Sequence, residues 1–134
     1  MKTIKTLAVF VTLLLASVVV SFAKSPEKTE EVTKNLVRSL EHDVDGVVEA
    51  SIYNSLFLQK YYPEANMKKV INKLNEVAEN SSNPSIQYKA QLASLYLSNY
   101  SSNDLSLDEY KGESEKLFQK ISDELTTKLL VSND

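Results

Sequence analysis

Residues 84–99 read PSIQYKAQLASLYLSN, and this stretch decides the class of fold. Apolar residues occupy nearly every side of a helix drawn through it, and a proline stands at its start. Residues 46–61 show the same pattern. Because a helix that is apolar nearly all round is buried on several sides, the two stretches predict two central helices.

Three other stretches have one apolar stripe and a charged opposite side, which is typical of a helix that buries a single face. They are residues 26–41, 67–80 and 107–130. No run alternates apolar and polar residues as a half-buried strand would. The sequence therefore predicts an all-α fold, a five-helix bundle in which two apolar central helices are flanked by three amphipathic ones.

Polar residues mark the expected helix starts. Ser25 precedes Pro26, Asp45 precedes the second helix, and Asn66 precedes the third. Residues 106–109 read SLDE, a capping box that predicts the start of the fifth helix. Gly112 then falls in the first turn of that helix and is expected to weaken it by about 1 kcal/mol.

An internal similarity joins the two central helices. Residues 55–61 (SLFLQKY) align with residues 94–100 (SLYLSNY), and the helices that follow also align. The duplicated helix–turn–helix of residues 46–130 resembles the repeat unit of HEAT and tetratricopeptide proteins. The chain also resembles uncharacterised small secreted helical proteins of Bacteroidota-type bacteria, a resemblance that implies no particular activity.

Residues 1–23 read MKTIKTLAVFVTLLLASVVVSFA and have the three parts of a secretory signal peptide: a basic start, an apolar centre and a small-x-small end. We expect its removal to leave one helical domain, residues 24–134, that is periplasmic or secreted and not inserted in the membrane. The alternative is an N-terminal membrane anchor, since 18 uncharged residues separate Lys5 from Lys24.

Composition limits the partners. The 18 acidic residues outnumber the 15 basic ones, so no nucleic-acid partner is expected. The chain contains no cysteine, although small exported domains often use disulfides. Its core is therefore expected to be sufficient without covalent crosslinks.

No set of residues predicts catalysis. His42 is the only histidine, and no nucleophile motif or glycine-rich phosphate loop is present. Residues 41–52 and 104–115 resemble calcium loops in the spacing of their acids. The first has Ile52 where a bidentate glutamate is needed, and the second has Glu109 in place of the turn glycine. We expect no catalytic residue, no metal site and no cofactor.

Two charged residues lie inside the predicted central helices. Glu49 and Lys89 stand at nearly equivalent positions of the repeat and are expected to face each other as a buried ion pair. Alternatively, they line a groove that a partner enters, because unpaired buried charges are rare without a function.

Three tyrosines, Tyr61, Tyr62 and Tyr100, lie at corresponding ends of the two central helices. Their rings are expected to close the core with the hydroxyl groups in water. The alternative is an interaction patch, because tyrosine is enriched at binding hot spots.

These observations predict an exported, non-catalytic protein–protein interaction module. The alternative is a carrier or sequestering protein for a small apolar ligand that binds between the central helices. Ala50, Ala90 and Ala93 would there mark either close helix contact or space for the ligand.

Overall fold

The computed structural model describes residues 26–100 and 106–133, so the expected signal peptide lies outside the described residues. The elements are α2 (Pro26–Leu40), α3 (Asp45–Tyr61), α4 (Met67–Asn80), α5 (Pro84–Asn99), the 3₁₀ helix η1 (Leu107–Tyr110) and α6 (Ser114–Val131). Within these ranges there is no strand, which confirms the all-α prediction. None of the described helices is long and apolar enough to cross a membrane.

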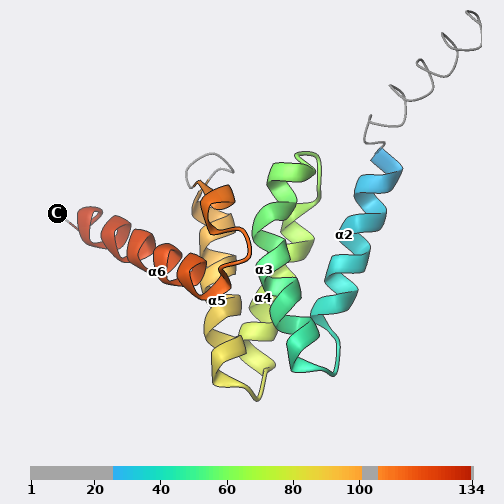
Figure 1. Ribbon diagram of the computed structural model, residues 1–134, viewed down its shortest axis with the longest axis horizontal. Coiled ribbons are helices and arrows are strands. Elements are labelled where there is room, and N and C mark those ends of the chain that lie inside the picture. The colour runs from blue at the N-terminus through green and yellow to red at the C-terminus, as the bar shows by residue number, and fades with distance from the viewer. Residues whose placement is uncertain (1–25, 101–105, 134) are drawn as a thin grey trace, which may run out of the picture.

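The helices from α2 to α5 run alternately up and down, and α6 starts beside α5 and projects sideways away from the bundle (Figure 1). The closest pairs are α4 with α5 and α2 with α3. Helices α3 and α5 run in the same direction and pack directly on each other, while α6 packs on α5. Helices α3 and α5 therefore occupy the centre of the bundle.

Burial follows this arrangement. Helix α4 buries only Val70 and Leu74 completely, as an outer helix does. The central helices bury residues on more than one side. Those of α3 are Val48, Ser51, Ile52, Ser55, Leu56, Phe57 and Leu58. Those of α5 are Ile86, Lys89, Ala90, Leu92, Ala93, Ser94, Tyr96 and Leu97. The expected pair of central helices is thus confirmed.

The helix hairpins of the structure are α2–α3 and α4–α5, so they begin one helix earlier than the repeat in the sequence suggests. The aligned units join α3 to α4 and α5 to α6. In the structure α3 packs mainly on α2 and α5, and α4 packs mainly on α5. The similarity between residues 55–61 and 94–100 therefore marks two parallel central helices that lie side by side.

Asparagine caps begin two of the helices. The side chain of Asn66 accepts a hydrogen bond from the backbone N–H of Lys69 (3.3 Å) at the start of α4, as predicted. Asn83 accepts from the N–H groups of Ser85 and Ile86, and Pro84 follows it in the first turn of α5. These bonds satisfy N–H groups that have no partner within the helix.

The predicted Asp45 cap is wrong. Val44 occupies the cap position, and Asp45 is the first residue of α3. The backbone N–H of Val44 donates to Nδ1 of His42 (3.1 Å) in the turn before the helix. The Asp45 carboxylate instead accepts from Nδ2 of Asn83 (3.1 Å) and links the starts of α3 and α5.

The predicted capping box at residues 106–109 is also wrong. Ser106 makes no side-chain capping bond, and the residues after it form η1. Gly112 has φ +83°, a left-handed conformation that an α-helix cannot contain and that glycine adopts at least cost. Helix α6 therefore begins only at Ser114, and Gly112 ends the preceding turn instead of weakening a helix.

Because α3 is central, truncating one of its buried side chains should lower the free energy of unfolding more than truncating an exposed side chain. Leu56 is 1 % exposed, whereas Leu95 on α5 is 42 % exposed. We expect Leu56→Ala to lower the free energy of unfolding by about 2–5 kcal/mol, because it leaves a cavity. The control Leu95→Ala should change it by less than about 0.5 kcal/mol. Urea denaturation followed by circular dichroism measures both, and equal effects would contradict a central α3.

Candidate functional site

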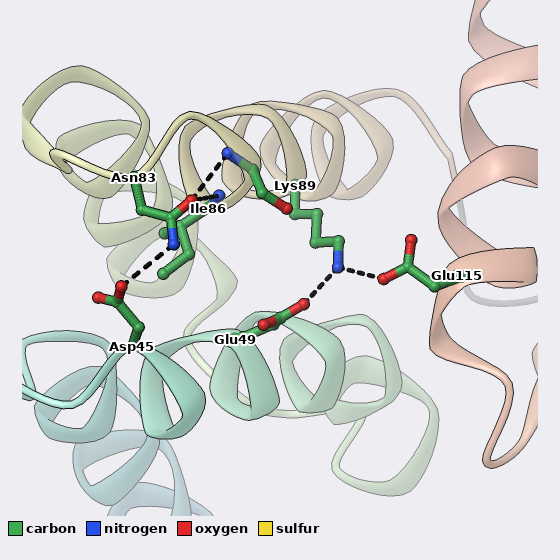
Figure 2. A network of polar contacts seen from close by, with 7 residues as sticks. Asp45, Glu49, Asn83, Ile86, Lys89 and Glu115 are labelled. Carbon is green, nitrogen blue, oxygen red and sulfur yellow. Dashed lines mark hydrogen bonds and ion pairs between the residues drawn. The ribbon is translucent and has the colours of Figure 1, made fainter.

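Lys89 is the point where three helices meet. Its Nζ bonds the carboxylate of Glu49 on α3 and Oε1 of Glu115 on α6 (2.5 Å), as Figure 2 shows. The Lys89 side chain is 6 % exposed, and those of Glu49 and Glu115 are 41 % and 81 % exposed. The structure thus places Glu49 and Lys89 together. Only the lysine is buried.

This contact keeps the Lys89 ammonium charged. Burial lowers the pKa of Lys89, but the hydrogen bonds to Glu115 and Glu49 raise it by more, so the pKa lies above the ordinary value of 10.5. The Phe118 ring of α6 lies 5.7 Å from Nζ and adds a cation–π contact. The Lys89 ammonium group therefore stays protonated at neutral pH and joins the three helices as a cation.

An apolar groove lies between α2 and α3. Its volume is about 450 Å³. Helix α2 contributes Val32, Asn35, Leu36 and Ser39. Helix α3 contributes Ser51, Tyr53, Asn54, Phe57, Leu58 and Tyr61. Tyr62 and Lys111 complete the lining. This set of apolar and aromatic side chains with a few polar groups is typical of a binding site.

The groove differs in charge from the other pockets. None of the described residues that line it is acidic, and Lys111 is its one charged residue. The pocket between α2 and the start of α4 contains Glu30 and Glu64. The pocket near the α2–α3 turn contains several acidic residues. Among these three pockets of the described residues, only the α2–α3 groove has no acidic residue in its lining.

We call residues 107–113 the strap. They comprise η1 and the three residues that join it to α6, and they include Lys111. The side chain of Leu107 is buried and anchors one end. At the other end the backbone N–H of Gly112 donates to the Tyr53 hydroxyl (2.9 Å), which in turn donates to the Tyr110 carbonyl (3.4 Å). These bonds hold the strap on α3 at the edge of the groove.

Charged side chains add to this attachment. Asp108 pairs with Lys60 of α3 and accepts from the Tyr61 hydroxyl (3.4 Å). Lys111 donates to the same hydroxyl (3.1 Å), and its Nζ lies 5.5 Å from the centroid of the Tyr61 ring. The hydrogen bond to Tyr61 raises the pKa of Lys111, so its ammonium group is charged at neutral pH.

The structure does not gather the three predicted tyrosines in one place. Tyr61 and Tyr62 line the groove. Tyr100 contacts α5 and α6 instead: its ring stacks on Tyr96, lies 4.2 Å from Nζ of Lys128, and its hydroxyl donates to the Glu124 carbonyl (3.1 Å). The three tyrosines therefore belong to two separate aromatic clusters and not to the single patch that was the alternative to core closure.

Apolar residues of the two central helices are completely buried. Ile52 shares a helix face with Glu49, three residues away, and is completely buried. Ala90 and Ala93 of α5 are completely buried as well. Ala50 is exposed, which rules it out as a marker of close contact between those helices. The apolar groove lies on the side of α3 that faces α2.

The described residues contain no cluster of three His, Asp or Glu side chains that could hold a metal ion. His42 accepts a backbone hydrogen bond in the α2–α3 turn. Of the second calcium-like segment, residues 104 and 105 lie outside the described part, and Asp108 is bonded to Lys60 and Tyr61.

Comparisons with known proteins do not indicate a function. No protein-family model matches the chain, and no curated protein and no solved structure matches it. The function must therefore be inferred from the groove and its chemistry.

Sequence reasoning missed the groove and Lys111. A signal was present, because Val32 and Leu36 on α2 and Phe57 and Tyr61 on α3 each stand four residues apart. Such pairs mark an apolar face, but the spacing does not say whether a neighbouring helix covers that face. The position of the strap has no signal of this kind.

The raised pKa of Lys89 predicts how stability depends on pH. A group whose pKa is higher in the folded state stabilises the fold below its unfolded pKa and loses that contribution as the pH rises through the folded value. The difference in free energy of unfolding, wild type minus Lys89→Met, should stay constant up to about pH 10 and fall above 10.5. Urea titrations at several pH values measure it, and a difference that does not change would contradict the contact.

The attachment of the strap can be tested at one hydroxyl. Tyr53→Phe removes the acceptor of the Gly112 N–H and should cost about 1 kcal/mol, with faster hydrogen exchange at Gly112. The matched control is Tyr88→Phe, which removes an exposed hydroxyl that bonds Ser122 (3.0 Å). Unchanged exchange at Gly112 in Tyr53→Phe would show that the strap is held by other contacts.

Proposed function

We propose that this chain is an exported, non-catalytic interaction module that binds an apolar segment of a partner protein in the α2–α3 groove. The observation that carries the proposal is the groove itself: an open, apolar cavity of about 450 Å³ between two helices, with tyrosines along one side. Tyrosine offers a large contact area and a polar hydroxyl, which suits it to binding surfaces.

The polar residues of the groove fit a peptide. Asn35 and Asn54 face it from α2 and α3, and their side-chain amides make no hydrogen bond within the described part of the chain. An amide both donates and accepts, so it can bond the backbone N–H and C=O groups of an extended segment. The apolar side chains of the groove would contact the side chains of that segment.

Two features of the sequence support the remaining parts of the proposal. Export rests on the signal-peptide layout of residues 1–23. The non-catalytic role rests on the lack of cysteine and on the single histidine, whose Nδ1 is used in a turn. The groove contains hydroxyl and amide groups but no side-chain base next to a nucleophile.

A small apolar ligand is the second candidate. The groove volume of about 450 Å³ lies within the range of small-molecule sites, which supports a carrier function. The ligand would then bind between α2 and α3, and not between the central helices. The open shape of the groove and its row of polar groups favour the peptide.

A blocked groove tests the proposal. A random peptide library displayed on phage is selected on residues 24–134, which contain every described helix. Asn35→Trp fills the groove from the exposed side of α2 and should weaken the selected peptides about tenfold or more. Gln91→Trp places the same side chain on the exposed side of α5 and should leave binding unchanged.

Other occupants give distinct results. A small apolar ligand would copurify as an added mass in native mass spectrometry, while no peptide is selected. A second copy of the chain would form a dimer that Asn35→Trp dissociates in analytical ultracentrifugation. Either result would overturn the peptide proposal, as would peptides that bind wild type and Asn35→Trp equally well.

A further inference from the structure

We infer that the segment bound in the groove carries a carboxylate beside its apolar side chains, and that Lys111 binds this carboxylate. The inference rests on the proposed function and names the chemistry of the partner: an apolar peptide segment that contains aspartate or glutamate.

The charge of the groove is the first observation. The chain has 18 acidic and 15 basic residues, yet among the described residues that line the groove there is no acid and one base. A single cation beside an apolar surface attracts an anion and repels a basic segment. The groove is therefore complementary to an acidic apolar peptide even though the whole chain is acidic.

The bonding of Lys111 is the second observation. Lys60, Lys73 and Lys89 each pair with a carboxylate of the chain. Within the described ranges Lys111 has no carboxylate within 4.0 Å, and its Nζ donates to the Tyr61 hydroxyl (3.1 Å). An ammonium group has three donors, so Lys111 keeps donors for a ligand.

The strap explains why Lys111 stays without an acid. After the hydrogen bond to Tyr61, the charge of Asp108 also raises the pKa of Lys111, but its carboxylate makes no ion pair with Lys111, because it pairs with Lys60 and accepts from Tyr61. The bond from Gly112 to the Tyr53 hydroxyl (2.9 Å) fixes the residue next to Lys111 on α3. The ammonium group is therefore held at the edge of the groove, where a carboxylate can accept from its remaining donors.

A reversal of charge tests the inference. The phage library is selected in parallel on wild type and on Lys111→Glu, and the frequencies of acidic and basic residues are compared. Wild type should enrich aspartate and glutamate, and Lys111→Glu should enrich lysine and arginine. The control Lys68→Glu makes the same change of net charge at an exposed residue of α4 and should select the same acidic peptides as wild type.

One selected peptide then gives a binding constant. Replacing its acidic residue by the neutral amide should weaken binding to wild type roughly two- to fivefold, as expected for an exposed ion pair, and should not weaken binding to Lys111→Glu. Urea denaturation of the Lys111→Glu variant checks that it is folded.

The possible failures are distinguishable. If peptides bind in the groove but show the same acidic frequency on wild type and Lys111→Glu, the inference about Lys111 is overturned and the proposed function stands. If no selected peptide is blocked by Asn35→Trp, the proposed function fails and the inference fails with it.

Discussion

The packing of α3 against α5 is the contact on which the rest of the structure depends. Both helices are buried on more than one side, so neither can exist without neighbours on its other faces. Helix α2 covers α3, while α4 and α6 cover α5. Lys89 lies in this contact and bonds acids from α3 and α6, which joins α6 to the central pair through a charge (Figure 2).

The groove follows from which residues α2 buries against the rest of the bundle. The buried residues of α2 are Thr29, Thr33 and Leu40, of which only Leu40 is a large apolar residue. The Thr33 hydroxyl donates to the Thr29 carbonyl (2.8 Å), so these threonines can be buried without unsatisfied groups. Val32 and Leu36 remain half-buried and form one side of the groove together with the aromatic side of α3.

The sequence predicted the fold more completely than the site. The helix count and the two central helices were predictable, because helical periodicity is a local property. The Asn66 cap was predictable for the same reason, since its bond spans three residues. The Asp45 and Ser106 caps were wrong because contacts from distant residues decide those turns: Asn83 bonds Asp45, and Tyr53 bonds Gly112.

The sequence by itself determined the class of fold and the pair of central helices, because each depends on spacing along a helix. The proximity of Glu49 to Lys89 was predicted from the internal similarity of the two central helices. Only the tertiary structure decided that Tyr61 and Tyr62 line a groove while Tyr100 contacts α6, and that Lys111 lies beside Tyr61. The physical reason is that these contacts join residues far apart in the sequence. Tyr61 and Lys111 are 50 residues apart, and their meeting depends on how α3, η1 and α6 pack, which no local pattern encodes.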